Sequence, residues 1–329
     1  MTKFLIIRFS SIGDIVLTTP VVRCLKNQVE GAEIHYLTKK QFSGVLSSNP
    51  YIDHLWLLED KLSELNKLLA AENFDYIIDL HNNLRSLRVK LDLRKKAFSF
   101  NKINLKKWLI VNFKINILPN NHIVDRYLET LKFFNVKNDL KGLDYFLSVD
   151  NLDSIKKNLP NLPERYVAMV IGAQHETKKA KPESLADICN KIKIPIVILG
   201  GKDDKILAES IVTKILNPDR IVNAAGLLSL DQSALLVKNS ELVITHDTGL
   251  MHIAAAFKKK IVSIWGNTIP EFGMYPYLSD SESRIFEVKN LKCRPCSKIG
   301  YQSCPKMHFK CMKNQNTTEI ANYINSVIV

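Results

Sequence analysis

The amino-acid sequence predicts an α/β protein of two doubly wound, Rossmann-like domains that face a central cleft. Its 329 residues exceed what one ordinary core needs and fit two domains of roughly 150 residues each. Short apolar runs alternate with amphipathic segments, which is the pattern of a parallel sheet covered by helices. A looser stretch at 135–163 interrupts this pattern, and the same order of elements then restarts. We therefore expect domains over 1–160 and 161–312, followed by a C-terminal helix within 313–329 that packs back on the first domain.

Each expected strand is a short apolar run, and each expected helix carries apolar residues three or four positions apart. In the first half the predicted strands are 4–9, 33–38, 54–58, 76–80 and 97–100, and the predicted helices are 14–29, 61–72, 83–91 and 123–134. In the second half the predicted strands are 166–171, 194–199, 220–224, 242–245, 261–265 and 284–288, and the predicted helices are 182–192, 204–216, 229–237, 250–257 and 318–327. Several polar loops directly follow these strands, where a cleft between such sheets binds its ligands.

The composition is that of a soluble globular protein, with 46% hydrophobic and 24% charged residues. No apolar run approaches the ~18–20 residues that a membrane span needs. The N-terminus does not resemble a secretory signal, because Arg8 ends the first apolar run and polar residues follow at once. The sequence therefore predicts a cytoplasmic protein.

The net charge of +13 is concentrated in two stretches. Ten Lys or Arg and one acid lie between Arg85 and Lys114, and seven Lys or Arg and no acid lie between Lys289 and Lys313. Such stretches indicate an anionic partner: nucleic acid, a phosphorylated glycolipid or a membrane surface. Solubilising charge explains them equally well. Aromatic residues accompany the first stretch, but no recognisable nucleic-acid module surrounds them, so we expect no nucleic-acid partner.

The segment 244–256 carries the most information about function. An apolar strand ends in Asp247-Thr248-Gly249, and a helix begins at once with His252 on its first turn. A helix N-terminus offers unpaired N–H groups and the positive end of a dipole, so it suits a phosphate. Asp247 can accept hydroxyl hydrogen bonds, and His252 can donate to a phosphate oxygen. The alternative is an ordinary buried helix with Asp247 or Thr248 as its N-cap.

A second polar loop, 8–14, follows the first strand and opens the first helix. Ser10, Ser11 and Gly13 form a turn of small residues, which lacks the glycines of the Gly-x-Gly-x-x-Gly dinucleotide fingerprint. Asp14 stands where its carboxylate can face the cleft and deprotonate an incoming hydroxyl. The alternative is that Asp14 only favours the positive end of the helix.

Two further loops follow strands of the second half. Residues 171–182 contain lysines ahead of a helix, which suits neutralisation of a diphosphate. Residues 199–204 carry Asp203 and Asp204, either of which can lie near a ribose. Each loop alone is weak evidence, because charged loops are common on protein surfaces.

Four of the six cysteines lie within nineteen residues, at Cys293, Cys296, Cys304 and Cys311, with His308 between the last two. In a cytoplasmic protein this clustering indicates a metal site before a disulfide framework. The Cys-x-x-Cys spacing fits zinc, and four bound cysteines leave no open position for catalysis. We therefore expect a structural role, as zinc ligands or as packed thiols.

Taken together, these segments resemble a known family. The motifs Ser10-Ser-Ile-Gly-Asp14, Asp79-Leu-His-Asn-Asn-Leu-Arg-Ser86 and Asp247-Thr-Gly-Leu-Met-His252 are similar to those of the ADP-heptose:lipopolysaccharide heptosyltransferases, glycosyltransferase family 9. The cysteine segment resembles one found in some members. The motifs run in the family order from residue 4 to 312, so the resemblance covers nearly the whole chain.

This resemblance implies a GT-B fold and an inverting transfer of heptose from ADP-heptose to the inner core of lipopolysaccharide or a related lipid-linked acceptor. It implies an acceptor-binding N-terminal domain and a C-terminal domain that binds the nucleotide sugar. Asp14 matches the general base, and the acceptor-binding positions are Ser11, Gly13, Arg85 and Arg88. The donor-binding positions are Lys179, Gln174, His175, Gly201, Asp203, Asp247, Thr248, Gly249 and His252. Relatives carry small hydroxyl residues where Gln174 and His175 stand.

The resemblance also implies a bacterial, monomeric enzyme that works without a required cofactor at the inner face of the cytoplasmic membrane. Other interpretations stay open. The chain could be a transferase of the same fold that uses another nucleotide sugar, or a non-catalytic module that binds sugar nucleotides or polyanions. An NAD-dependent oxidoreductase is a further alternative, weakened by the missing glycine fingerprint.

Overall fold

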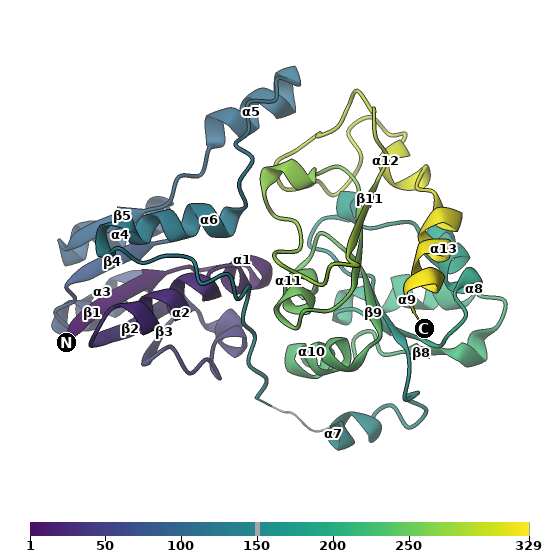
Figure 1. Cartoon of the computed structure of the whole chain (residues 1–329), viewed down its shortest axis with the longest axis horizontal. Helices are drawn as coiled ribbons and strands as arrows, with labels where there is room; N and C mark the ends of the chain where they lie inside the picture. The colour runs from purple at the N-terminus through teal and green to yellow at the C-terminus, as the bar shows by residue number, and fades with distance from the viewer. Residues whose placement is uncertain (149–151, 329) are drawn as a thin grey trace. The chain divides into compact units, whose positions relative to one another are not determined.

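A computed structural model describes residues 1–148 and 152–328. The chain forms two compact units, each with its own parallel sheet (Figure 1). The first unit contains Met1–Ile103 and Asn121–Ser148, and the second contains Asn104–Asn120 and the chain after Ser148. The boundary thus falls earlier than the predicted residue 160. The segment 104–120 belongs to the second unit, which the alternation of elements did not indicate.

The first unit is built on five parallel strands: β1 (Thr2–Ile7), β2 (Ala32–Lys39), β3 (His54–Leu58), β4 (Tyr76–Asp79) and β5 (Lys96–Ser99). Their order is β3-β2-β1-β4-β5. In the central strand β1, the residues from Phe4 to Ile7 are fully buried. All five predicted strands are confirmed, because short apolar runs of this kind suit a sheet covered on both faces.

Helices cover both faces of this sheet. α2 (Thr19–Gln28) packs against α6 (Ile123–Leu128), and α3 (Leu62–Ala71) packs against α4 (Leu84–Leu93). The single helix predicted over 14–29 is in fact two, α1 (Ile12–Val16) and α2. Pro20 stands in the first turn of α2, where its missing N–H costs nothing, and it favours a new helix start. The predicted helix 123–134 likewise ends in a 3-10 turn, Glu129–Phe134.

The second unit contains six parallel strands: β6 (Val167–Val170), β7 (Ile196–Leu199), β8 (Ile221–Asn223), β9 (Leu242–His246), β10 (Ile261–Trp265) and β11 (Arg284–Glu287). Their order is β11-β10-β9-β6-β7-β8, which is the Rossmann order. All six predicted strands are confirmed.

The helices of the second unit form two groups. α8 (Pro182–Lys191) packs against α9 (Lys205–Val212) and α13 (Thr317–Val327), whereas α10 (Leu230–Asn239) packs against α11 (Gly249–Ala256) (Figure 1). The sequence predicts that the C-terminal helix packs on the first domain, and this is wrong. Ile320 and Ile324 of α13 lie in the core of the second unit, because its apolar face matches that of α8.

Three helices were not predicted: α5 (Asn104–Phe113), α7 (Asp153–Lys156) and α12 (Lys310–Lys313). α7 and α12 have only four residues each, which is too short for a periodicity to show. α5 is apolar on most of its circumference, so it lacks the one-sided pattern by which a surface helix is usually recognised.

Both sheets have a topological switch point, where the chain leaves neighbouring strands in opposite directions. In the first unit it lies between β1 and β4, and in the second between β6 and β9. Ligands of open α/β sheets bind outside the carboxyl ends of the strands at this point. The loops that follow these four strands carry most of the predicted site residues, whereas Gly201 and Asp203 follow β7 and the clustered cysteines follow β11.

No helix among residues 1–148 and 152–328 combines the length and the apolar character needed to cross a membrane.

Candidate active site

Asp14 lies at the start of α1, in the loop after β1. Its Oδ1 atom lies 2.7 Å from Arg8 Nη2. Its Oδ2 atom accepts a hydrogen bond from Ser11 Oγ at 2.8 Å and another from the Ser11 backbone N–H at 3.2 Å. These bonds orient the carboxylate, yet the side chain remains 21% exposed. Asp14 is therefore fixed in position and still reachable by a hydroxyl group.

Arg8 is the residue that organises this site. Its Nε donates to the Ser10 carbonyl at 2.7 Å, and its Nη1 donates to the Leu80 carbonyl at 2.6 Å. Burial alone would lower the pKa of the Arg8 guanidinium, but the nearby Asp14 carboxylate and two tyrosines raise it. A permanently charged guanidinium favours the ionised form of Asp14, which is the form that accepts a proton.

The loop after β4 is held by Asp79, whose side chain is fully buried. Its carboxylate accepts hydrogen bonds from the backbone of His81 and Asn82, at 3.0 and 2.7 Å, and from Ser86 Oγ at 2.9 Å. Lys90 Nζ completes the set at 2.8 Å. Lys90 thus neutralises a buried carboxylate that shapes the loop, so it is not available to an acceptor.

Arg85 and Arg88 project from α4 and are exposed. The Arg85 guanidinium lies 5.6 Å from the ring centroid of Phe9, and Arg88 Nε lies 3.9 Å from an Asp92 carboxylate oxygen. Both charges therefore remain accessible to an anion. The basic stretch from Arg85 to Lys114 is divided between the two units, because its last three lysines belong to the second.

In the second unit, Asp247 follows β9 and pairs with Lys178. The distance between Lys178 Nζ and Asp247 Oδ2 is 2.6 Å, and Thr268 Oγ1 donates to the same oxygen at 3.1 Å. Thr268 follows the neighbouring strand β10. The loops after three strands, β6, β9 and β10, therefore meet at Asp247.

Lys179 is engaged by two carboxylates: its Nζ lies 2.7 Å from Glu176 Oε1 and 3.1 Å from Asp204 Oδ1. Asp204 is buried and also accepts the backbone N–H of Gly201 at 2.9 Å. A Cβ atom at Gly172 would collide with the Asp204 carboxylate, so this close approach requires glycine. Asp203, which was assigned to donor binding, is exposed, and Asp204 is the member of this acidic pair that contacts Lys179.

The N-terminus of α11 begins at Gly249 and is capped by Thr248, whose hydroxyl accepts the Met251 N–H at 3.4 Å. His252 lies on the first turn and is buried. Of the two predicted candidates for the N-cap, Thr248 and not Asp247 caps the helix. Because the capping hydroxyl engages one N–H group, the remaining first-turn N–H groups can still face an anion.

His246, at the end of β9, is a further buried histidine at this edge of the sheet. Its Nε2 accepts a hydrogen bond from the Ala180 backbone N–H at 3.0 Å. Burial, followed by the positive charge of Lys179, lowers its pKa to about 4. His246 is therefore neutral at physiological pH, and it anchors the lysine-bearing loop through its neutral form.

Gln174 and His175 precede these lysines. Gln174 is exposed, and His175 packs so closely on Gly300 that a Cβ atom there would overlap its side chain. Thr177 Oγ1 accepts the Tyr301 N–H at 2.8 Å, and the Thr177 N–H donates back to the Tyr301 carbonyl at 3.1 Å. The segment around Gly300 therefore packs against the lysine-bearing loop and is hydrogen-bonded to it.

The same segment carries the four clustered cysteines, which are free thiols. Burial and the neighbouring thiols raise the pKa of Cys296 to about 12, and burial raises that of Cys311 to about 11. Cys293 Sγ lies 3.8 Å from His308 Nε2. Thiols and imidazole are suitable zinc or iron ligands. The sulfur atoms nevertheless lie farther apart than in a closed tetrahedral site, because no three of them come within 4.8 Å of one another among the described residues.

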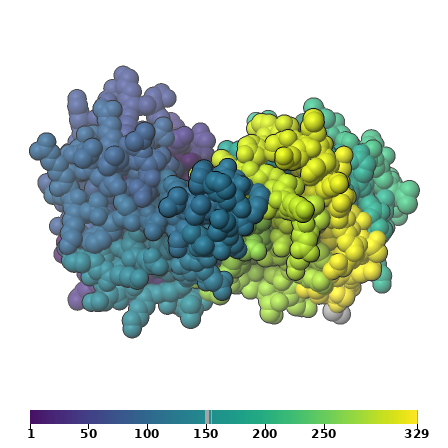
Figure 2. All heavy atoms as spheres, turned by 90° about the horizontal axis from the view of Figure 1, so that it is seen from above, coloured from purple at the N-terminus to yellow at the C-terminus, as the bar shows by residue number. Residues whose placement is uncertain are grey.

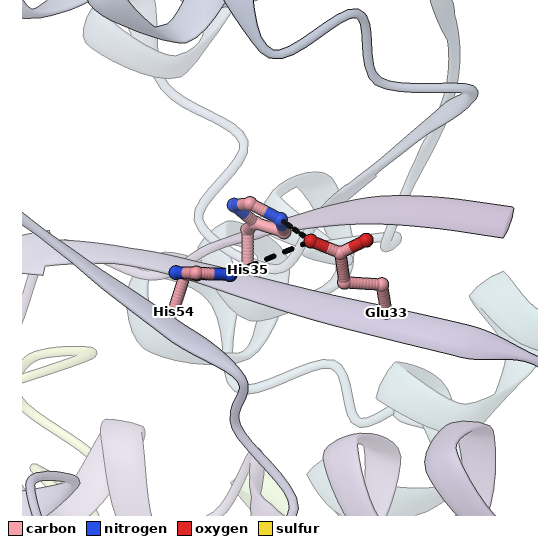
Figure 3. A group of neighbouring side chains, drawn as sticks. All are labelled: Glu33, His35 and His54. Carbon is pink, nitrogen blue, oxygen red and sulfur yellow. Dashed lines mark hydrogen bonds and ion pairs between the residues drawn. The ribbon is translucent and has the colours of Figure 1, made fainter. Parts of the chain in front are cut away.

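Three potential metal ligands do come within 4.8 Å of one another at Glu33, His35 and His54, at the amino ends of β2 and β3 (Figure 3). His35 Nε2 lies 2.9 Å from Glu33 Oε1, and Trp56 Nε1 donates to His35 Nδ1 at 2.9 Å. This donation requires the lone pair on Nδ1, so Nε2 carries the proton and donates to Glu33. The cluster is a hydrogen-bonded network with no free imidazole lone pair on His35, and it does not fit a metal.

Several residues of these sites were missed at the level of sequence: Arg8, Lys178, His246, Thr268 and Asn267. Arg8 could have been found, because a charged residue directly after a buried strand has to find a partner. Asn267 is buried beside Thr268, and neither of its amide atoms has a hydrogen-bond partner among the described residues. Two surface hollows of about 470 and 690 Å³ lie elsewhere, beside β11, and share Glu271, Glu287 and Lys289.

Comparisons with known proteins show the family to which this chain belongs. Residues 62–306 match glycosyltransferase family 9 (heptosyltransferase). Lipopolysaccharide heptosyltransferase 1 of Campylobacter coli is 29% identical, over 81% of this chain and 84% of that protein. Lipooligosaccharide heptosyltransferase 2 of Haemophilus influenzae is 25% identical, over 91% of this chain and 93% of that protein.

Solved structures share the fold. A glycosyl transferase family 9 protein from Veillonella parvula has a TM-score of 0.81 at 19% identity, covering 99% of this chain and 97% of that one. Escherichia coli heptosyltransferase WaaC with ADP has a TM-score of 0.70 at 17% identity, covering 99% and 100%. The iron-containing dodecameric glycosyltransferase TibC of E. coli has a TM-score of 0.60 at 12% identity, covering 99% and 78%.

The two Rossmann-like units thus form a GT-B fold of the heptosyltransferase type. The family match spans most of the chain and includes the loops that carry Lys179 and Asp247. The chain is a glycosyltransferase, and it belongs to glycosyltransferase family 9, the heptosyltransferases.

Proposed function

We propose that this enzyme transfers a heptose from ADP-heptose to a sugar of the lipopolysaccharide inner core, with inversion at the anomeric carbon. The observation that carries this proposal is the ion pair of Arg8 with Asp14 after the central strand of the first sheet. Support comes from the names of the relatives, which are lipopolysaccharide and lipooligosaccharide heptosyltransferases. Related structures are also described with ADP-2-deoxy-2-fluoro heptose and ADP-D-beta-D-heptose.

Asp14 acts as the general base of this reaction. It takes the proton of the acceptor hydroxyl as the hydroxyl oxygen attacks the anomeric carbon on the face opposite the ADP group. A positioned base of this kind contributes on the order of 10²–10⁴-fold to the rate. Arg8 and Ser11 hold the carboxylate through three contacts, so Asp14 meets the hydroxyl in one orientation.

The second unit binds the donor and stabilises the leaving ADP. Negative charge grows on the diphosphate as the glycosidic bond breaks. Lys178, Lys179 and the N-terminus of α11 supply positive charge and N–H groups that are already in position, which costs no reorganisation during the reaction. Asp247 accepts hydrogen bonds from the sugar hydroxyls once Lys178 turns from it to the phosphate.

The acceptor is anionic and lipid-linked, and the exposed Arg85 and Arg88 of α4 hold its phosphate or carboxylate groups. Arginine suits this role because its planar fork can bind both oxygens of such a group at once. The enzyme therefore works in contact with the cytoplasmic face of the inner membrane, where such an acceptor is presented.

The test is the substitution Asp14→Asn, which keeps the shape of the side chain and removes its basicity. We expect the release of ADP in the presence of ADP-heptose and a deacylated core acceptor to fall by at least roughly 10²-fold. The affinity for ADP, measured by calorimetry, should stay within twofold of the wild type. Asp60→Asn, at an exposed carboxylate of the same unit, is the matched control and should leave turnover unchanged.

Substantial residual turnover of Asp14→Asn would exclude Asp14 as the base. Thermal stabilisation by a panel of nucleotide sugars tests the donor separately, because a ligand that binds only the folded state raises Tm by mass action. Gln174 and His175 replace the small hydroxyl residues of relatives, so the panel includes ADP-hexoses. A larger shift with an ADP-hexose than with ADP-heptose would change the donor and leave the role of Asp14 intact.

A further inference from the structure

The helix α5 and the segment that follows it expose large apolar side chains. Leu105 is 70% exposed, Trp108 49% and Phe113 59%. Ile115 and Ile117, just after the helix, are 53% and 48% exposed. We call these five side chains the α5 surface. Figure 2 shows the segment, in dark blue, on the face of the molecule turned to the viewer. A dense exposed apolar group of this kind marks an interaction site.

The opposite side of α5 is firmly packed within the second unit. Ile110 is buried against Ile269 and Phe272, and Lys107 Nζ lies 5.7 Å from the ring centroid of Phe272. Lys114 Nζ donates to the Pro295 carbonyl at 2.7 Å. The helix is therefore held on one side, and its apolar residues on the other side serve no packing role within that unit.

The segment that carries the α5 surface is basic. Residues 104–120 contain Lys106, Lys107 and Lys114 and no acid. Helices with Trp, Phe and Leu on one side and lysines nearby lie in the interface of a bilayer, where anionic lipids attract the lysines. Tryptophan prefers the headgroup level because its ring has an apolar body and a polar N–H.

We propose that the α5 surface inserts into the interfacial region of an anionic lipid bilayer and so docks the enzyme on the membrane. α5 has ten residues. It is thus about 15 Å long. It is too short for a hydrocarbon core of ~30 Å, so it lies along the membrane plane. Leu105, Trp108 and Phe113 enter the boundary between headgroups and acyl chains, and Lys106 contacts lipid phosphates.

The charge of the segment favours a bilayer over a second copy of the chain. A symmetric contact would bring the same surface of two molecules together. The lysines beside Trp108 would then face the identical lysines of the partner, and such a juxtaposition of like charges is unfavourable. An anionic bilayer offers the opposite charge and an apolar interior at the same place.

This proposal rests on the proposed function only in that a lipid-linked acceptor gives a reason for membrane docking. Its test measures binding without catalysis. The full-length protein is sedimented with vesicles of phosphatidylcholine alone and with vesicles that contain phosphatidylglycerol. The variant replaces Leu105, Trp108 and Phe113 by Gln. Its matched control replaces Ile206, Leu216 and Leu227 by Gln, which are 80%, 87% and 47% exposed in the same unit.

We expect wild type and control to bind vesicles with phosphatidylglycerol, and binding to fall in high salt. The triple variant of the α5 surface should bind at least roughly 1,000-fold more weakly, since each of the three apolar side chains contributes about a factor of ten or more. Turnover of a deacylated acceptor should be unchanged, while KM for a membrane-embedded acceptor rises. If the wild type turns over neither acceptor, the proposed function is refuted, and vesicle binding alone then decides the present proposal.

Equal vesicle binding by wild type and the triple variant would overturn the proposal. So would a wild-type dimer in analytical ultracentrifugation that the triple variant disrupts, because a second copy would then cover the surface. Circular dichroism and Tm of the variant verify that it is folded, as expected for replacements of exposed side chains.

Discussion

Arg8 Nη2 lies 2.7 Å from Asp14 Oδ1, and the same guanidinium also donates hydrogen bonds to the backbone carbonyls of Ser10 and Leu80. One buried arginine thereby ties the loop after β1 to the end of β4. Arg8 thus shapes the switch point of the first sheet with two of its nitrogen atoms, Nε and Nη1, and contacts Asp14 with the third, Nη2.

Arg8 is a positioning residue for Asp14 in the proposed reaction. We expect Arg8→Met to lower kcat by on the order of 10²-fold, because Asp14 loses the group that orients it and favours its charged form. KM for the acceptor should change far less. Arg8→Lys keeps the charge without the fork of donors, so it should recover part of kcat. An equal fall in kcat for both variants, together with a large loss in Tm, would indicate a purely structural role.

Lys178 and Lys179 should both contribute to the affinity for ADP. Lys178→Met and Lys179→Met each remove one positive charge from the loop, and we expect each to weaken ADP binding about tenfold, the effect of one charge-assisted hydrogen bond. Calorimetric titration with ADP measures this directly. Lys191→Met is the control, since Lys191 pairs with Asp187 on the surface of α8. Unchanged ADP affinity in both loop variants would remove the lysines from the donor site.

Arg85 and Arg88 should determine the affinity for the anionic acceptor. We expect Arg85→Gln/Arg88→Gln to raise acceptor KM about tenfold or more and to leave kcat and donor KM nearly unchanged, since the two charges act on binding alone. Lys90 is left intact because it neutralises the buried Asp79. The control is Lys61→Gln, at a highly exposed lysine of the same unit. An unaltered acceptor KM would assign the acceptor to other residues.

The stability of the enzyme should fall between pH 6.5 and pH 4. Burial lowers the pKa of His246 from 6.5 to about 4, so the unfolded chain binds a proton there that the folded chain does not. The stabilisation is complete above pH 6.5 and is lost as the pH falls toward 4, by on the order of 3 kcal/mol. His246→Gln keeps an acceptor for the Ala180 N–H but has no proton to gain. Urea denaturation at several pH values should show a shallower pH dependence for this variant, and identical slopes would contradict the assignment.

Metal content decides between the two structural roles expected for the cysteine segment, zinc ligands or packed thiols. The thiols of Cys296 and Cys311 have raised pKa values, so metal binding must release protons and should be weaker at low pH. If the thiols are zinc ligands, metal analysis should show about one ion per chain, and removal by a chelator or by Cys296→Ser should lower Tm. Cys24→Ala, at a buried thiol outside the segment, should leave the metal content unchanged. Metal-free protein of the same Tm would favour packed thiols.

The strands of the described residues were predictable because most of them are short apolar runs in sheets that are covered by helices. The boundaries of the helices were less predictable. Nothing in the periodicity of 14–29 separates α1 from α2, and only the position of Pro20 indicates that a second helix begins there. α13 shows the main limit. Its apolar stripe predicts burial, but which surface it meets depends on the shape of α8, which is distant in the sequence.

Sequence alone determined the fold class, the loops that carry the chemistry and the family, because strand periodicity and short polar motifs are local properties of the chain. The phosphate-binding interpretation of 247–252 and the candidate base Asp14 belong to this local information. The partners of these residues were decided only by tertiary structure. Two of these contacts, Lys178 with Asp247 and Asp204 with Lys179, join loops that follow different strands, and they form only once the parallel strands bring their carboxyl ends together. The third contact, Arg8 with Asp14, joins two turns of one loop. Exposure of the α5 surface was equally undetermined, because an apolar helix shows which of its sides is buried only after it has packed.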